Sequence, residues 1–196
     1  MPQQTVIFLG PQGSGKGTQA SLLEKYLKKN NSRPVAHFTM GDALRDFMTK
    51  ENYTSERIRS SMDRGELQPL FLAAGLLVNF LEAHIMGDTH LIIDGFPRTD
   101  TQVAILDSSL EFYNREPVCV LHLSIPDNVA VTRLVERGRA DDTPEGIQKR
   151  LRWTHEKNAP ILAWFRSNPR YRVLEINSSP PIEAVHQSVL KALNLS

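Results

Sequence analysis

The residues with the clearest chemical potential form a glycine-rich loop near the start of the chain, Gly10-Pro11-Gln12-Gly13-Ser14-Gly15-Lys16-Gly17-Thr18. The loop follows an apolar run and opens a helical pattern, which is the context of a phosphate-binding loop. Its glycines let successive backbone N–H groups point into one concavity, and the following helix adds its positive N-terminal end. Lys16 can reach the outer phosphates, and Thr18 supplies a hydroxyl one residue later than usual. A glycine-rich turn that only joins strand to helix is the alternative, but spacing, lysine and context favour phosphate binding.

A carboxylate that could hold a metal ion stands at the end of another apolar run. Asp94 closes the run 91–94, where a strand is predicted to end. In nucleotide-binding loops of this kind, an acidic residue at that place holds Mg²⁺, directly or through water. A turn or capping aspartate before Gly95 is the alternative. Beside a phosphate loop the metal role is favoured, so Asp94 is a predicted Mg²⁺ ligand.

The elements that must position these residues alternate between strands and helices. Five short apolar runs are predicted to be strands, over residues 5–9, 34–39, 91–94, 118–125 and 171–176. Helical patterns cover residues 18–29, 42–48, 55–64, 69–84, 99–110, 127–137, 144–157 and 181–193. The strands are almost continuously apolar, which is typical of strands covered on both faces. The order predicts an α/β fold with a doubly wound, five-stranded parallel sheet and right-handed crossovers.

Local signals mark several helix ends. Thr143-Pro144 and Ser179-Pro180 each have the pattern of an N-cap followed by the first helical residue, and Gly65 and Gly87 are expected to end helices. Two stretches interrupt the alternation of strands and helices. Residues 40–70 hold more helix than one crossover needs, and residues 137–143 form a charged segment between two helices. Inserted pieces near the carboxyl ends of strands are candidate lids.

Composition limits the classes of function. The chain has 196 residues, is 40% hydrophobic and 23% charged, and carries a net charge of +1, which indicates one well-cored domain. There is no broad electrostatic case for nucleic acid or an anionic membrane as partner. A single cysteine, Cys119, excludes an internal disulfide and a multi-cysteine zinc site, and it fits a reducing compartment. The N-terminus resembles neither a secretory nor a transit peptide, so a cytoplasmic location is expected.

Several ordered motifs resemble those of the adenylate kinases, within the nucleoside monophosphate kinase family. The resemblance runs from about residue 5 to residue 193 and includes the exact form of the phosphate loop. It also includes the following segments: Gly41-Asp42-Ala43-Leu44-Arg45, Asp94-Gly95-Phe96-Pro97-Arg98 with Gln102, Arg133 to Arg137, Gly138-Arg139-Ala140-Asp141-Asp142-Thr143, and Arg150-Leu151. It implies a P-loop NTP hydrolase-like core of residues 1–39, 70–136 and 144–196. The helical segment 40–69 would bind the monophosphate, and residues 137–143 would form a short lid, all within one domain of residues 1–196.

The resemblance also implies roles for single residues. The ATP site would comprise Gly13, Ser14, Gly15, Lys16, Gly17, Thr18, Arg133, Arg137 and Pro180. The AMP site would comprise Met40, Arg45, Glu66, Leu67, Gln68, Gly95, Phe96, Pro97, Arg98, Gln102, Arg139 and Arg150. The catalytic side chains would be Lys16, Arg98, Arg137, Arg139 and Arg150. The implied reaction is reversible phosphoryl transfer from MgATP to AMP, giving two ADP, with Thr18 beside Asp94 at the Mg²⁺. A monomer is expected because nothing in the sequence indicates an oligomer interface, and the single cysteine excludes a zinc site in the lid.

Elementary chemistry explains why such a site needs arginines. The acceptor phosphate carries about −1.5 to −2 charges at neutral pH, so it is already a nucleophile and needs no general base. The site must bring two polyanions together and neutralise charge on the equatorial oxygens, for which the planar guanidinium is suited. Any one arginine could instead be a solvated surface charge. The two acidic residues Asp141 and Asp142 are expected to pair with lid arginines rather than to bind metal.

The identity of the acceptor base is less clear from the sequence. Met40 stands where adenylate kinases usually have threonine, and Gln102 could form a capping box with Thr99 instead of reading a base. Loss of one hydrogen-bond partner costs about 0.5–1.5 kcal/mol, which weakens base discrimination without abolishing it. AMP is the expected acceptor, and a UMP- or CMP-preferring kinase is the alternative. A different class, a catalytically silent module that senses adenine nucleotides, would not need so many cations.

Overall fold

The computed structural model describes residues 1–139 and 142–195. Within them lies a five-stranded parallel sheet with the order β2-β3-β1-β4-β5. The strands are β1 (Thr5–Leu9), β2 (Val35–Thr39), β3 (His90–Asp94), β4 (Val118–Ser124) and β5 (Tyr171–Asn177). The three central strands are the most deeply buried, whereas the edge strands β2 and β5 are partly covered. The predicted fold class is confirmed.

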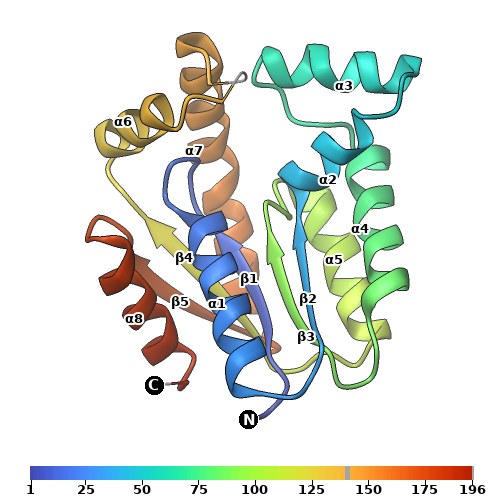
Figure 1. Ribbon diagram of the computed structural model, residues 1–196, viewed down its shortest axis with the longest axis vertical. Helices are drawn as coiled ribbons and strands as arrows, with labels where there is room; N and C mark the ends of the chain where they lie inside the picture. Colours follow the sequence, from blue (N-terminus) through green and yellow to red (C-terminus); the bar gives the residue numbers. More distant parts are fainter. Residues whose placement is uncertain (140–141, 196) are drawn as a thin grey trace.

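Helices cover both faces of the sheet (Figure 1). They are α1 (Lys16–Asn30), α2 (Met40–Phe47), α3 (Tyr53–Asp63), α4 (Leu70–His84), α5 (Asp100–Phe112), α6 (Asp127–Arg137), α7 (Pro144–Ser167) and α8 (Ile182–Ala192). Successive residues of β1 alternate between two cores: Ile7 packs with residues of α4, α5 and α7, and Phe8 packs with α1 and α8. This period-two alternation is what a strand covered on both sides requires.

The two inserted stretches lie beyond the carboxyl ends of the strands. Figure 1 shows α2 and α3 above one side of the sheet, and α6 with the first half of α7 above the other side. Residues 40–69, 137–139 and 142–143 therefore flank the edge where ligands bind in open α/β sheets. None of the helices in residues 1–139 and 142–195 is long and apolar enough to cross a membrane.

Two of the predicted helix ends are confirmed. Thr143 is the N-cap of α7, its side chain accepts a hydrogen bond from the Gly146 N–H at 3.1 Å, and Pro144 is the first helical residue. Gly65 follows α3 with φ +64°, a left-handed conformation that favours glycine.

Two other predictions about helix ends are wrong. Helix α7 continues through Pro160 to Ser167, because the buried side chains Ile161, Leu162 and Phe165 pack on the sheet core and outweigh the lost hydrogen bond of the proline. Helix α8 begins at Ile182 instead of Pro180, because the preceding residues are tied to other elements: the N–H of Ser179 donates to Asn177 and its carbonyl accepts from Arg133.

Helix α4 ends at His84, as its predicted range has it, but Gly87 does not cap it and lies in the turn that follows. Its C-cap is Ile85, which has extended backbone and packs against the core. The other predicted bounds differ by a few residues from the observed ones.

Candidate active site

The phosphate loop follows the central strand β1 and is held tightly by its neighbours. A Cβ atom on Gly10, which has φ +133°, would lie 2.3 Å from the carbonyl oxygen of Leu123 at the end of β4. A Cβ atom on Gly13 would lie 2.6 Å from the carbonyl oxygen of Ala130 in α6. Only glycine fits such close approaches. The loop is therefore fixed between β4 and α6, and its N-terminal helix end is available to an anion because Gly15 provides no side-chain cap to α1.

Lys16 is folded onto this loop and is almost completely buried. Its ammonium group donates hydrogen bonds to the carbonyl oxygens of Gly10 at 2.9 Å and of Pro11 at 2.6 Å. Burial lowers the pKa of Lys16 to about 7; the cations Arg98 and Arg137 also lower it, and Asp94 opposes them. A phosphate group at the loop would favour the charged ammonium and raise this pKa again.

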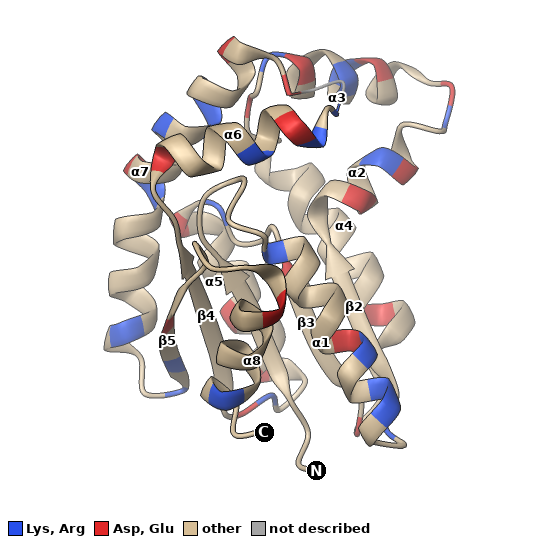
Figure 2. Ribbon diagram, turned by 60° about the vertical axis from the view of Figure 1, so that its left-hand side comes forward, with Lys and Arg blue, Asp and Glu red and all other residues tan. Residues whose placement is uncertain are grey.

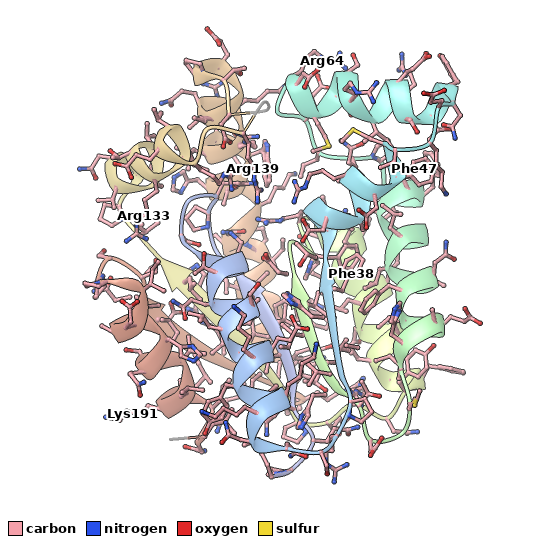
Figure 3. The ribbon with its side chains drawn as sticks, viewed as in Figure 1. Phe38, Phe47, Arg64, Arg133, Arg139 and Lys191 are labelled. Carbon is pink, nitrogen blue, oxygen red and sulfur yellow. The ribbon has the colours of Figure 1, made fainter. Side chains whose placement is uncertain are left out.

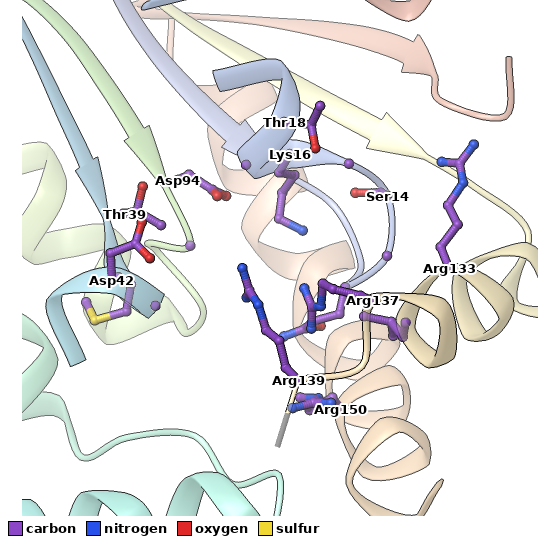
Figure 4. A pocket seen from close by; sticks show the side chains of 18 of the residues that line it. Ser14, Lys16, Thr18, Thr39, Asp42, Asp94, Arg133, Arg137, Arg139 and Arg150 are labelled. Atoms are coloured by element: carbon purple, nitrogen blue, oxygen red, sulfur yellow. The ribbon is translucent and has the colours of Figure 1, made fainter. Parts of the chain in front are cut away.

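The predicted metal ligands lie next to the loop. In the sheet Asp94 of β3 pairs with Phe8 of β1, so its carboxylate arrives beside the loop. A Cβ atom on Gly17 would lie 3.4 Å from Oδ2 of Asp94, and Oδ1 is buried without a hydrogen-bond partner among the described residues. Figure 4 shows Asp94 and Thr18 near Lys16.

A buried carboxylate oxygen that lacks a donor suits a cation or its bound water. The part of the chain that the structure describes contains no group of three or more His, Cys, Asp or Glu residues that could hold a metal ion by itself. One carboxylate and one hydroxyl fit Mg²⁺ that arrives with phosphates, because this ion keeps several waters and uses few protein ligands.

Three arginines gather below the phosphate loop. Figure 4 shows Arg137, Arg139 and Arg150 on one side of the cavity, with Arg139 extending toward Lys16. Arg137 binds Asp142 through two hydrogen bonds of 2.9 and 2.8 Å, and Arg150 binds the same carboxylate at 2.7 Å. Asp142 thus orients two guanidinium groups that come from α6 and α7.

Asp142 stays ionised in this setting. Burial would raise the pKa of its carboxyl group, but the hydrogen bond and charge of Arg137 and the charge of Arg150 outweigh burial and hold this pKa below its usual range. The prediction that Asp142 pairs with lid arginines is confirmed. Asp141, for which the same was predicted, lies outside the described residues.

Arg133 points in a different direction. Its guanidinium donates to the carbonyl oxygens of Ser178 at 2.9 Å and Ser179 at 3.2 Å. In Figure 4 it lies apart from the other labelled arginines. Arg133 and Pro180 both line the cavity, so α6 and the segment before α8 together form one wall.

The opposite wall comes from the inserted segment and from the start of α5. Met40 is 8% exposed and packs closely against Gly95: a Cβ atom on Gly95 would lie 3.1 Å from the Cβ of Met40. Arg45 pairs with Asp42 at 2.5 Å. In Figure 3, Phe47 and Arg64 lie on this side, whereas Arg133 and Arg139 lie on the α6 side.

Gln102 already has structural partners. Thr99 caps α5 by accepting a hydrogen bond from the Gln102 N–H at 3.3 Å, and Oε1 of Gln102 accepts one from the Arg98 N–H at 2.6 Å. Half of the capping box that the sequence offered as an alternative is therefore present: Thr99 caps the helix, whereas the Gln102 side chain binds the N–H of Arg98, one residue before the N-cap. Gln102 nevertheless lines the cavity, so its amide belongs to the wall as well as to the cap.

Arg98 connects the two halves of the site. Its guanidinium donates to the carbonyl oxygens of Gly95 at 3.2 Å and of Gly10 at 3.3 Å. The indole of Trp153 lies with its ring centroid 5.7 Å from the guanidinium carbon. Burial lowers the pKa of Arg98, and the nearby Asp94 opposes this shift.

The phosphate loop, Asp94, Met40, Gln102 and the arginines Arg45, Arg98, Arg133, Arg137, Arg139 and Arg150 line one cavity of about 820 Å³. Its described lining carries seven lysine and arginine side chains against four acidic ones, while the outer surface mixes both signs (Figure 2). Positive charge is therefore concentrated locally. Of the predicted site residues, the cavity brings together all except Phe96 and Pro97, which do not line it. Phe96 is instead fully buried in the core beside the sheet.

Three contributors were missed by the sequence analysis. Trp153 of α7 lines the cavity, and Lys149 of the same helix donates a hydrogen bond to Glu66 of the cavity wall at 3.1 Å. Gln12 of the phosphate loop also lines the cavity, and its side chain accepts a hydrogen bond from the buried hydroxyl of Thr154 at 3.1 Å. The only signal in the sequence was that 149, 153 and 154 lie within one helical turn of Arg150.

Comparisons with known proteins agree with this site. The sequence model of the family described as adenylate kinase matches residues 8–170. The chain is 37% identical over 180 residues to adenylate kinase 1 of Nostoc sp., covering 92% of this chain and 93% of that protein. It is 36% identical over 186 residues to adenylate kinase 1 of Synechocystis sp., covering 95% of both, and 31% identical over 193 residues to the adenylate kinase of Phocaeicola vulgatus, covering 96% and 97%. The chain belongs to the adenylate kinase family.

Proposed function

We propose that this protein is a phosphotransferase that transfers a phosphoryl group reversibly from MgATP to AMP and so forms two ADP. The observation that carries the proposal is the single cavity in which a phosphate loop and a set of arginines face each other. The names of the relatives, all adenylate kinases, support the same reaction. The proposed catalytic residues are Lys16, Arg98, Arg137, Arg139 and Arg150.

The donor side would bind ATP by its phosphates. The backbone N–H groups of residues 13–18 and the start of α1 would cradle them, with Lys16 on the outer phosphates. Arg133 and Pro180 would lie against the adenine base. Thr18 and Asp94, directly or through water, would hold Mg²⁺, which neutralises charge on the β- and γ-phosphates.

The acceptor side would place AMP opposite. Arg45 and Arg98 would bind its phosphate, while Met40, Gly95, Gln102 and the loop 66–68 would surround the base. The acceptor oxygen is already anionic, so no side chain has to remove a proton. Arg137, Arg139 and Arg150 would neutralise the charge that spreads over the transferring group.

The segments 40–69 and 137–143 would act as lids. Described residues of both segments, among them Met40, Glu66 and Arg139, line the cavity, and closing the lids would exclude the water that could otherwise hydrolyse ATP. We further propose that the enzyme works as a cytoplasmic monomer on nucleotides alone, with neither nucleic acid nor membrane as partner. The net charge of +1 supports the absence of nucleic acid and anionic membrane as partners.

AMP is expected to be the preferred acceptor in an assay that couples ADP formation to a detectable signal. With AMP, CMP, UMP and GMP tested below saturation, kcat/KM for AMP should exceed the others by about 10-fold or more, because a pocket that hydrogen-bonds one base leaves polar groups unpaired with another. A higher kcat/KM for CMP or UMP would reassign the base. AMP binding without any ADP formation would instead indicate a silent sensing module.

Binding of ATP is expected to take up a proton at Lys16. In the protein without nucleotide the pKa of Lys16 is about 7, so its amino group is mostly neutral at pH 8. Beside the phosphates of bound ATP the amino group regains its charge. Titration calorimetry at pH 8 in buffers of different ionisation enthalpy should therefore show an uptake of about 0.9 proton per bound nucleotide, falling to about 0.1 from this group at pH 6.

The Lys16→Gln variant, which has no titrating group there, is the control for the proton measurement. It should lose the uptake at pH 8 even where high nucleotide concentration restores binding. Equal proton uptake in the variant and the parent protein would show that another group takes up the proton.

A further inference from the structure

Trp153 occupies an unusual place between the two nucleotide sites. It lies on α7, three residues after Arg150, and lines the cavity. Its indole N–H donates to the carbonyl oxygen of Gly65 at 3.1 Å, and its ring faces the guanidinium of Arg98 at 5.7 Å. One side chain thus contacts both the loop that begins the base-binding wall and the arginine proposed for the acceptor phosphate.

The loop at Gly65 is seated directly on α7. A Cβ atom on Gly65 would lie 2.7 Å from the carbonyl oxygen of Gly146, so the two backbones touch. Gly146, Lys149 and Trp153 have the spacing i, i+3 and i+7, which places them on one face of the helix. The loop at Gly65 packs on this face of α7 and continues into Leu67 and Gln68, which line the cavity.

Among these contacts, that of Trp153 is the most directional. The ion pair between Lys149 and Glu66 is about 40% exposed on both sides, and such pairs contribute little. Glu66 is also held by Arg64 and so does not depend on α7. The indole N–H, in contrast, fixes a backbone carbonyl, and the rigid ring orients a guanidinium.

We propose that Trp153 is a positioning residue for the acceptor nucleotide: it holds the loop 65–68 through its N–H and the guanidinium of Arg98 through its ring. The proposal rests on the proposed function, because it concerns the acceptor of the same reaction. The indole N–H and the aromatic ring of Trp153 thus have separate roles, and substitutions can remove the N–H alone or both together. Trp153→Phe keeps an aromatic face and loses the N–H. Trp153→Leu loses both.

Steady-state kinetics with each substrate varied separately test this assignment. Trp153→Phe should raise KM for AMP about 3- to 10-fold, which is the loss expected for one hydrogen bond, while KM for ATP and kcat stay within about 2-fold. Trp153→Leu should in addition lower kcat, by about 5-fold or more, because Arg98 loses the face that orients it. A merely structural role would change both KM values together. An unchanged KM for AMP in Trp153→Phe overturns the proposal.

Trp164 provides the matched control. It is the other tryptophan of the chain and packs against Phe165 and Tyr171 at the core, outside the cavity lining. Trp164→Phe should leave the ratio of the two KM values unchanged. In that variant Trp153 is the only tryptophan left, so addition of AMP without ATP should change the tryptophan emission. In Trp153→Phe, where only Trp164 emits, addition of AMP should leave the emission constant.

The fluorescence measurement also tests the proposal if Trp153→Phe does not fold or if the parent protein has no kinase activity. If Trp153→Phe does not fold, which circular dichroism would reveal, an emission of Trp164→Phe that does not respond to AMP still contradicts the proposal. If the parent protein forms no ADP from ATP and AMP, the proposed function fails. The emission change on AMP binding remains measurable in that case and decides the place of Trp153 at the nucleotide separately.

Discussion

Replacement of Lys16 by alanine is expected to lower kcat by about 10²- to 10³-fold, the range seen when one preorganised electrostatic group is removed from an active site. Lys16 is the cation held inside the phosphate loop itself, with its ammonium on the carbonyl oxygens of Gly10 and Pro11. Without it, one cation fewer neutralises the charge that develops on the transferring phosphoryl group. ADP formation at saturating ATP and AMP measures the loss.

The fold should survive this substitution. Because burial lowers the pKa of Lys16 to about 7, the unfolded chain binds more protons than the native one between about pH 7 and pH 10, and the native state is destabilised toward lower pH. Removal of the ammonium removes this penalty, so Tm near pH 7 should equal or exceed that of the parent protein. Active sites commonly contain groups such as this buried lysine, which lower the stability of the native state but serve function.

Lys28→Ala is a matched control on the same helix. Lys28 is exposed and pairs with Glu24 one turn earlier in α1, away from the cavity. Its loss should leave kcat unchanged within about 2-fold, since exposed ion pairs contribute little. A Lys16→Ala enzyme with near-native kcat would show that the loop backbone alone carries the phosphate.

The phosphate loop could be predicted from sequence because its constraints are local. Gly10 and Gly13 are required by backbone approaches of less than 3 Å, and a strand before and a helix after them are visible as patterns of apolar residues. Asp94 follows from the same logic, because parallel pairing of β1 with β3 brings it next to the loop. The predicted sheet was correct for the same reason: buried strands carry continuous apolar runs.

Other features depend on tertiary contacts that no local pattern records. A proline such as Pro160 normally ends a helix, yet the packing of the residues after it extends α7 to Ser167. Trp153 and Gly65 are 88 residues apart in the chain, and Gln12 and Thr154 are 142 apart. Such contacts are set by how α7 crosses the sheet, so their residues had no distinctive spacing in the sequence.

The arginines were identifiable only as a set. Each could have been a solvated surface charge, and two of them owe their orientation to Asp142, whose carboxylate they share. Phe96 and Pro97 illustrate the converse, since their place in a recognised motif did not put them in the cavity lining. Motif membership therefore indicates which segment approaches a ligand, whereas burial and direction decide which of its side chains do.

Arg98→Ala is expected to lower kcat/KM for AMP by about 10³-fold or more, a loss of about 4 kcal/mol in transition-state stabilisation. The size follows from the position of this guanidinium, which donates to Gly10 in the phosphate loop and to Gly95 on the acceptor side. It is therefore the cation best placed to draw the acceptor phosphate toward the donor. Initial rates with AMP varied at saturating ATP measure this kcat/KM. The affinity for ATP, measured by calorimetry, should change far less.

Two further variants separate charge from geometry in that result. Arg98→Lys keeps a cation but loses the planar fork, so it should recover only part of the rate if bidentate binding matters. Arg152→Ala, at an exposed position of α7 outside the cavity lining, should behave like the parent protein. If Arg98→Ala retained near-native kcat/KM for AMP, the acceptor phosphate would have to be held elsewhere, and Arg45 with the cluster around Asp142 would be the remaining cations able to hold it. The guanidinium that links Gly10 to Gly95 would then be a structural tie between β1 and β3, with its charge used for packing instead of catalysis.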